Sequence, residues 1–232
     1  FQLICFDMVS EPSTPGAYML REGKTIQRKE LDKFFNRTDK RLNMDITHRC
    51  PLECLRCGRQ NSFRNKGLPV PGEDLSLEDF DKITDHFSRI SFCGQYSDPI
   101  HHPQFIEILK ICNQKKLKVE VHVASSFKSK EFFINAFKAY PEAEWIFGID
   151  GLPEESHTYR VNQDGKKLYE IMLESKNHLN TKPAWQYIIF SYNEDHVDLA
   201  LEMATKDNLS FLIINSSRWM GKTDWLKPKT RK

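Results

Sequence analysis

Short apolar stretches alternate with segments of helical periodicity along this chain, and this alternation restricts its possible folds more than any other feature. Six stretches have the length and pattern of β-strands. The five segments between them place apolar residues three and four positions apart, as amphipathic helices do. The predicted strands cover residues 41–46, 90–92, 119–123, 145–150, 185–192 and 211–214, and the predicted helices cover residues 76–87, 103–112, 130–140, 166–179 and 196–206.

Strands that are joined through helices run parallel, because the chain must cross back over the sheet before it starts the next strand. The sequence therefore predicts an α/β fold with a parallel sheet. A complete eight-stranded barrel of this kind needs about 250 residues, whereas this chain has 232 residues and six strand–helix units. We expect an open, partial (β/α)6 TIM-like barrel, with its functional residues at the C-terminal ends of the strands.

Composition excludes several other classes. The mean hydropathy is −0.58 and no apolar run approaches the roughly 18 residues of a membrane span, so we expect no membrane partner. Lys and Arg outnumber Asp and Glu by 34 to 32, and a net charge of +2 is too small to imply a nucleic-acid partner by itself. Six cysteines are too few for a disulfide-rich scaffold.

Three of the six cysteines lie within eight residues, directly after the first predicted strand. The segment Cys50-Pro-Leu-Glu-Cys54-Leu-Arg-Cys57 brings three thiolates to one loop, where each can bind one iron of an iron–sulfur cluster. Because such clusters normally have four thiolate ligands, three leave one iron open to a substrate or cofactor. The alternatives are a structural zinc site completed by His48 or Cys93, and three unrelated cysteines.

Residues 42–57 resemble the signature of the radical S-adenosylmethionine (SAM) enzymes, in which C-x3-C-x2-C follows the first strand of a six-stranded partial barrel. The resemblance extends over residues 41–215. It implies that Cys50, Cys54 and Cys57 hold a [4Fe–4S] cluster whose fourth iron chelates SAM. It also implies reductive cleavage of SAM to a 5′-deoxyadenosyl radical that abstracts hydrogen from a substrate. We therefore expect an electron donor such as flavodoxin or ferredoxin as a partner. We also expect a reducing cytoplasm as the location.

Further SAM contacts are implied where later segments resemble the family. Residues 93–99, after the second predicted strand, resemble the Gly-Gly-Glu-Pro segment that holds the methionine amino group, which implicates Gly94, Gln95 and Asp98. After the third strand, Ala124-Ser125-Ser126 stands where the family has Thr-Asn-Gly, and this implicates Ser125.

The fourth and fifth strands add candidates near the ribose and the adenine. Residues 146–151 resemble the ribose-side stretch, with Asp150 as the implied contact or, alternatively, a turn cap, and with Gly148 in place of a serine. Arg160 resembles the arginine that pairs with the SAM carboxylate, which a guanidinium can hold through two hydrogen bonds. The fifth strand implicates Ile189 and Asn193 near the adenine.

The residue before the third cysteine departs from the family pattern. It is usually aromatic and lies near the adenine, whereas here it is Arg56. A guanidinium plane can stack on adenine in place of a ring, so the resemblance still implies a cofactor contact from Arg56.

The two ends of the chain are predicted to lie outside the barrel. Residues 1–40 form an N-terminal extension that makes a poor signal peptide, since its first nine residues are apolar but include Asp7. Residues 216–232 form a basic tail, in which six Lys and Arg residues accompany Asp224 alone. We expect a solvated, frayed terminus, with a phosphate-binding or partner-binding tail as the alternative.

Three functions follow as hypotheses. The preferred one is a radical SAM enzyme that acts on a peptide, protein or other large substrate, because residues 185–194 resemble the peptide- and protein-modifying branch. No cysteine follows Cys112, which is predicted to be core, so the auxiliary clusters of that branch cannot form within this sequence. The second hypothesis is modification of a nucleoside or nucleic acid, consistent with two basic ends. The third is a non-catalytic iron–sulfur or zinc protein.

Overall fold

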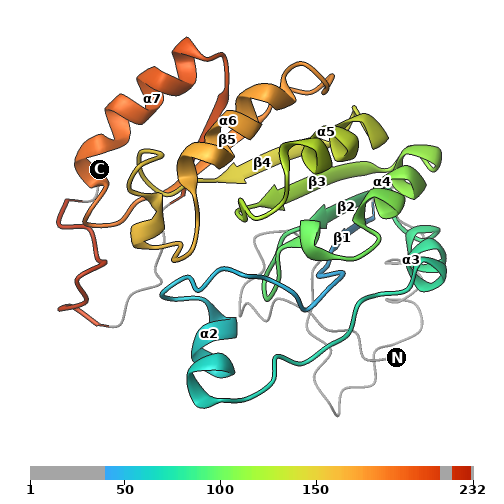
Figure 1. Ribbon diagram of the computed structural model, residues 1–232, viewed down its shortest axis with the longest axis horizontal. Helices are drawn as coiled ribbons and strands as arrows, with labels where there is room; N and C mark the ends of the chain where they lie inside the picture. Colours follow the sequence, from blue (N-terminus) through green and yellow to red (C-terminus); the bar gives the residue numbers. More distant parts are fainter. Residues whose placement is uncertain (1–39, 215–220, 231–232) are drawn as a thin grey trace, which may run out of the picture.

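The computed structural model describes residues 40–214 and 221–230, and it contains one parallel sheet of six strands (Figure 1). The strands follow their sequence order across the sheet, and each pairs in parallel with the next. They are β1 (Arg41–Asn43), β2 (Arg89–Phe92), β3 (Lys118–Val123), β4 (Glu144–Gly148), β5 (Ala184–Ile188) and β6 (Ser210–Ile214). Because β1 and β6 lie at opposite edges of the sheet, the predicted open, partial barrel is confirmed.

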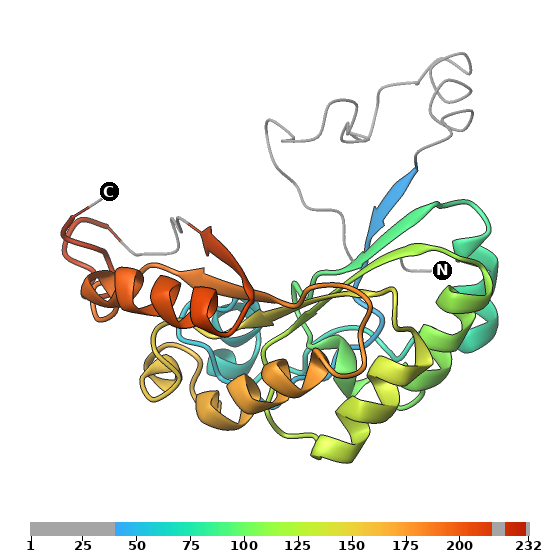
Figure 2. The ribbon, with the colours of Figure 1, turned by 90° about the horizontal axis from the view of Figure 1, so that it is seen from above.

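Helices connect successive strands and gather along one face of the sheet (Figures 1 and 2). Side-chain caps fix the beginning of three of them: Ser76, Ser129 and Asp164 each accept a backbone N–H from the first turn. The helices are α2 (Gly58–Ser62), α3 (Leu77–Thr84), α4 (Phe105–Gln114), α5 (Lys130–Ala139), α6 (Gly165–Ser175) and α7 (Val197–Lys206); short 3-10 helices are η1 (Arg64–Lys66), η2 (Pro99–His101), η3 (Ser156–Thr158) and η4 (Glu194–His196).

The core lies between the sheet and these helices. On β3, Val119, Val121 and Val123 are at most 2% exposed and pack against the helices, whereas Glu120 and His122 point to the opposite face. Aromatic rings fill the centre of the core. The fully buried Trp145 ring contacts four others, with centroid distances of 6.1 Å to Phe105, 6.4 Å to Phe133, 4.8 Å to Phe137 and 6.1 Å to Phe147.

Some elements end earlier than the sequence predicts. β1 ends at Asn43, although the backbone N–H of Met44 still donates to Ser91 O of β2. β5 ends at Ile188 rather than near residue 192, because the side chain of Asn193 accepts the N–H of Phe190 and turns the chain. α4, in contrast, begins later than predicted, at Phe105 rather than Pro103, because His102 after η2 has an extended backbone and Gln104 is the N-cap.

Several predictions fall on residues 1–39, 215–220 and 231–232, outside the described part of the chain. These include the N-terminal extension, apart from Lys40, and the beginning and end of the basic tail. Among the helices of residues 40–214 and 221–230, none combines the length and the apolar character that a membrane crossing requires.

Candidate functional site

The loops at the C-terminal ends of the strands meet at one edge of the sheet, and backbone hydrogen bonds tie them together. The loop after β1 is joined to the loop after β2, since the N–H of Asp98 donates to Arg49 O over 3.0 Å. It is also joined to the segment after β4, since the N–H of Glu53 donates to Val161 O over 3.1 Å and that of Leu55 donates to Tyr159 O over 3.2 Å. These bonds assemble the predicted site from segments far apart in sequence.

The cysteine loop, residues 50–57, carries the three predicted cluster ligands. Cys50, Cys54 and Cys57 are free thiols and all are half-buried. The N–H of Cys57 donates to Cys54 O over 3.1 Å, which closes a turn, and α2 begins at the next residue. The structure therefore places all three thiols on one loop at the C-terminal edge of the sheet.

Burial and neighbouring charges set the chemistry of these thiols. Burial raises the pKa of Cys50 to about 12, and burial likewise raises the pKa of Cys54 to about 11. The guanidinium of Arg160 acts in the opposite direction on the pKa of Cys54, as that of Arg59 does on the pKa of Cys50. Positive charge therefore lies close to the sulfur atoms, where thiolates would need it.

Two arginines donate hydrogen bonds to backbone carbonyl groups in this loop and beside it. Arg59 is 5% exposed, and its guanidinium donates to His48 O over 2.7 Å and to Tyr96 O over 3.1 Å. Arg64 donates to Cys50 O over 3.0 Å. Burial lowers the pKa of Arg59, which shows how far its charge is removed from water.

Within residues 40–214 and 221–230, no three His, Cys, Asp or Glu side chains already converge as they would around a metal ion. The donor set nevertheless fits the [4Fe–4S] cluster that the motif implies. Cys50, Cys54 and Cys57 are all free thiols on one loop of eight residues. Thiolate sulfur is also the ligand that iron–sulfur clusters use.

A tight turn after β2 contains Gly94 and Gln95. Gly94 has a φ of +60°, and a Cβ atom there would lie 2.6 Å from Ser97 O, so this position requires glycine. The carboxylate of Asp45, just after β1, accepts the N–H of Tyr96 over 3.3 Å and the hydroxyl of Ser97 over 2.5 Å. Asp45 thereby fixes the turn that the resemblance places near SAM.

Asp98 organises the neighbouring loop rather than pointing freely into the site. Its side chain is 3% exposed, and one carboxylate oxygen accepts the N–H groups of Ala124 over 2.9 Å and Ser125 over 2.7 Å. Burial raises its pKa, which these two backbone hydrogen bonds partly offset. Ser125 is fully buried, and its hydroxyl lies 2.8 Å from His101 Nε2. A SAM contact from Asp98 or Ser125 stays a prediction.

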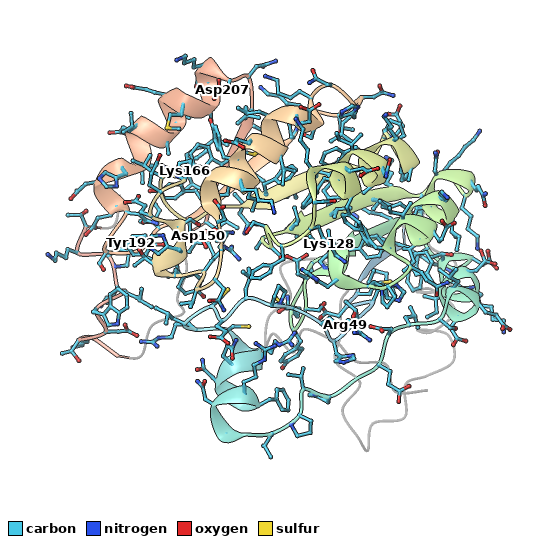
Figure 3. All side chains as sticks on the ribbon, viewed as in Figure 1. Arg49, Lys128, Asp150, Lys166, Tyr192 and Asp207 are labelled. Atoms are coloured by element: carbon cyan, nitrogen blue, oxygen red, sulfur yellow. The ribbon has the colours of Figure 1, made fainter. Side chains whose placement is uncertain are left out.

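Asp150 and Arg160 are paired with each other. Arg160 Nε lies 2.7 Å from Asp150 Oδ2, and Asp150 Oδ1 accepts the N–H of Ile188 over 2.8 Å. Burial lowers the pKa of Arg160, but the Asp150 carboxylate together with the Cys54 and Tyr159 side chains raises it by more, so the guanidinium stays charged. Figure 3 labels Asp150 beside Tyr192, whose hydroxyl donates to Asp150 O over 2.6 Å. Their predicted contacts with the ribose and the SAM carboxylate are untested.

The same pair explains why Gly148 stands where the family has serine. A Cβ atom at residue 148 would lie 2.7 Å from Arg160 Nη2 and 3.0 Å from Arg160 Cζ. The guanidinium occupies the space that a serine side chain would need. The departure from the family pattern is therefore linked to the position of Arg160.

The two candidates near the adenine have different roles in the backbone. Asn193 is fully buried; its side chain accepts the N–H of Phe190 over 2.7 Å and donates to Ile188 O over 3.0 Å. Ile189 is partly buried against the core, and its N–H donates to Ile214 O over 3.2 Å. Asn193 thus shapes the end of β5, and adenine contacts from both residues stay predictions.

Arg56 contacts the C-terminal segment of the chain. Its guanidinium donates twice to Asp224 Oδ2, from Nε over 3.1 Å and from Nη2 over 2.9 Å. Leu226 is fully buried. The expectation of a solvated, frayed tail does not hold at Asp224 and Leu226, which pack against the cysteine loop, whereas most of residues 221–230 are exposed. Stacking of Arg56 on adenine stays a prediction.

Sequence reasoning missed three residues that hold the site together: Asp45, Gln163 and Asp224. Gln163 is 5% exposed, and its side-chain amide donates to Ala124 O over 2.6 Å and to Gly148 O over 2.8 Å, which joins the ends of β3 and β4. A carboxylate directly after a predicted strand was the available signal for Asp45. Gln163 and Asp224 carry no local signal, since their partners are distant in sequence.

No protein-family model matches this chain, and no curated protein matches it. Solved structures do match. The crystal structure of Streptococcus suis SuiB has a TM-score of 0.62 at 12% sequence identity, over 84% of this chain and 43% of that chain. SuiB bound to S-adenosylmethionine gives a TM-score of 0.61 at 12% identity, over 84% of this chain and 44% of that chain. Methylornithine synthase (PylB) gives 0.57 at 11% identity, over 88% of this chain and 62% of that chain.

At these identities the similarity shows a shared fold. The chain spans less than half the length of SuiB and less than two thirds of the length of PylB.

Proposed function

We propose that this chain is the barrel of a radical SAM enzyme, in which Cys50, Cys54 and Cys57 hold a [4Fe–4S] cluster and SAM binds beside it. The observation that carries the proposal is the C-x3-C-x2-C loop directly after the first strand of an open, parallel six-stranded sheet. SuiB and PylB, which have the same fold, are radical SAM enzymes. Motif and fold are independent observations, and both favour the same chemistry.

In this proposal a bound cluster would supply the electron that cleaves SAM to methionine and a 5′-deoxyadenosyl radical, which then abstracts hydrogen from the substrate. The chain's own residues prepare the place for this step. Arg64 holds a carbonyl group of the cysteine loop, Arg59 holds those of His48 and Tyr96 beside the loop, and Arg160 offers positive charge close to Cys54. Gly94 and Asp98 fix the two neighbouring loops against which SAM would lie.

The open face of the sheet supports a polar substrate. Glu120 and His122 of β3 lie on the face opposite the helices, and His122 forms a hydrogen bond with Gln186 of β5. Such a surface suits a molecule with hydrogen-bonding groups better than a purely apolar one. We propose a peptide or protein substrate, with support from SuiB, which has been crystallised bound to precursor peptide SuiA.

The electron donor is the proposed partner. The cysteine loop is bordered by Arg49, which pairs with Asp74 over 2.8 Å, by Arg64, which lies 3.9 Å from Glu53, and by the exposed Lys66. Paired charges of both signs beside the loop can orient a charged partner protein. A reduced flavodoxin or ferredoxin has the chemistry that this role requires.

Cluster binding is tested by anaerobic reconstitution with iron and sulfide, followed by iron analysis, absorption and electron paramagnetic resonance spectra. Wild-type protein should retain about four irons per chain. Cys54→Ala should lose most of that iron while its thermal unfolding curve stays close to wild type. Cys112→Ala is the matched control, because this buried thiol lies on α4 in the core and should be dispensable for iron.

Other results would favour other functions. Stoichiometric zinc without iron, together with unfolding of the Cys54→Ala variant, would support a structural metal site instead. Binding to RNA or DNA that weakens steeply with salt, together with SAM cleavage stimulated by the nucleic acid, would redirect the substrate proposal.

A further inference from the structure

The ordered residues 221–230, named here the C-terminal strap, cross the site beside the cysteine loop. Asp224 of the strap pairs with Arg56, the residue directly before Cys57. Both Nε and Nη2 of Arg56 reach Asp224 Oδ2, at 3.1 and 2.9 Å. The Asp224 side chain is 1% exposed and that of Arg56 is 22% exposed, so little water competes for this pair.

Two residues after Asp224, Leu226 anchors the strap in an apolar cluster. Its buried members are Tyr159, Ile188, Phe190 and Leu226, and the partly buried Cys54, Leu55 and Tyr192 pack against them. The Tyr159 and Phe190 rings stack with centroids 4.3 Å apart. Since Cys54 and Leu55 belong to the cysteine loop, Leu226 joins the strap to the loop through shared packing.

Backbone hydrogen bonds hold the strap in place on the barrel. The N–H of Ser191 donates to Leu226 O over 3.1 Å, and the N–H of Leu226 donates to Asp224 Oδ1 over 3.0 Å. Farther along, the N–H of Thr230 donates to Glu194 over 2.9 Å. The strap is therefore held at Asp224 and Leu226 and again at Thr230, and Asp224 is presented to Arg56 with one oxygen already engaged.

We propose that the C-terminal strap positions the cysteine loop, with Asp224 acting through Arg56 and Leu226 acting through Cys54 and Leu55. That the positioned loop then retains its cluster rests on the proposed function. The arginine before Cys57 thereby gains a role that an aromatic side chain could not have, because it offers charge to a carboxylate located 168 positions away in the sequence. Asp224 and Leu226 are positioning residues.

The test measures hydrogen–deuterium exchange at the Leu55 and Cys57 amides in metal-free protein, where both amides are hydrogen-bonded. Asp224→Asn should speed their exchange on the order of tenfold, because it leaves the charge of Arg56 without its anionic partner. Asp224→Glu should stay near wild type. Trp225→Ala is the matched control, since this neighbouring side chain is 55% exposed and should leave both amides unchanged.

Leu226→Ala provides a second, independent variant, expected to speed exchange at the same two amides through lost packing. The double variant Arg56→Gln with Asp224→Asn should be no worse than either single variant, since both remove one interaction. After reconstitution, Asp224→Asn should lose iron to a chelator several times faster than wild type or Asp224→Glu. An electron paramagnetic resonance spectrum of the reduced Asp224→Asn cluster that differs from that of wild type would also support the positioning role.

The proposal would be overturned if Asp224→Asn altered exchange only at strap amides such as Leu226 and left Leu55 and Cys57 unchanged. If Asp224→Asn and Asp224→Glu changed the exchange of these two amides equally, the role of the Asp224 charge would also be overturned. If wild-type protein took up no iron, the proposed function would fail, while exchange in the metal-free protein would still decide the role of the strap.

Discussion

On β3 the face under the helices carries Val119, Val121 and Val123, whereas the opposite face carries Glu120 and His122 within the same stretch of six residues. The valines are almost completely buried, and burial of such side chains provides most of the stability of a fold. The polar side chains remain partly accessible. One face therefore makes the barrel stable, and this leaves the other face available to a substrate.

The strongest test of this comparison is to remove a large ring from the helix-covered face. Trp145→Ala should lower the free energy of unfolding by about 3–5 kcal/mol, because it leaves a cavity among Phe105, Phe133 and Phe137. Urea unfolding followed by circular dichroism measures this. A loss below about 1 kcal/mol would mean that this face does not carry the stability.

A smaller decrease in the free energy of unfolding should follow when a side chain is added at the end of β4. Gly148→Ala should cost about 1–3 kcal/mol, because the new Cβ atom would meet the guanidinium of Arg160 at 2.7 Å. Gly58→Ala is the control, since its Cβ would meet Tyr96 only at an ordinary 3.6 Å. Equal stability of the two variants would contradict the link between Gly148 and Arg160.

The polar side of the site should also respond to pH. Burial, with added repulsion from Lys128 and Arg59, lowers the pKa of His101 from 6.5 to about 4. The unfolded chain therefore binds this proton more readily, and the folded state loses stability as the pH falls from about 6.5 towards 4, with no effect above that window. Urea unfolding at about pH 7 and about pH 5 should show a smaller acid loss for His101→Gln than for wild type. If both proteins lost the same free energy of unfolding, His101 would not be the group responsible.

The smallest effect is expected on the open face itself. Glu120→Gln should change the free energy of unfolding by no more than about 0.5 kcal/mol, because this side chain is 28% exposed and its ion pair with Arg89 is long, at 3.5 Å. A loss as large as that of Trp145→Ala would show that both faces support the fold alike, and the comparison would fail.

The periodic elements were predictable from sequence because their signals are local. The alternating valines of β3 and the capping pair of Ser76 and Asp79 can be recognised without knowing the neighbours of either element. The cysteine spacing is local too. In contrast, nothing near Asp98 in the sequence indicates that its carboxylate accepts the backbone of Ser125, because that contact exists only once β2 and β3 are adjacent.

The same reason explains the errors and omissions at the site. Asp150 and Arg160 both bear charges that suit a cofactor, and only the folded chain shows that they pair with each other. The basic composition of the C-terminal residues favoured a solvated tail, but one acidic and one apolar residue, Asp224 and Leu226, decide its place. Composition averages over such single contacts, so it cannot reveal them.

The most direct test of the central claim is the formation of 5′-deoxyadenosine, measured by mass spectrometry after anaerobic reconstitution, addition of SAM and reduction. The account predicts that wild-type protein and Cys112→Ala form this product, and that Cys50→Ala, Cys54→Ala and Cys57→Ala do not. Wild-type protein that retains about four irons per chain but never cleaves SAM would contradict it.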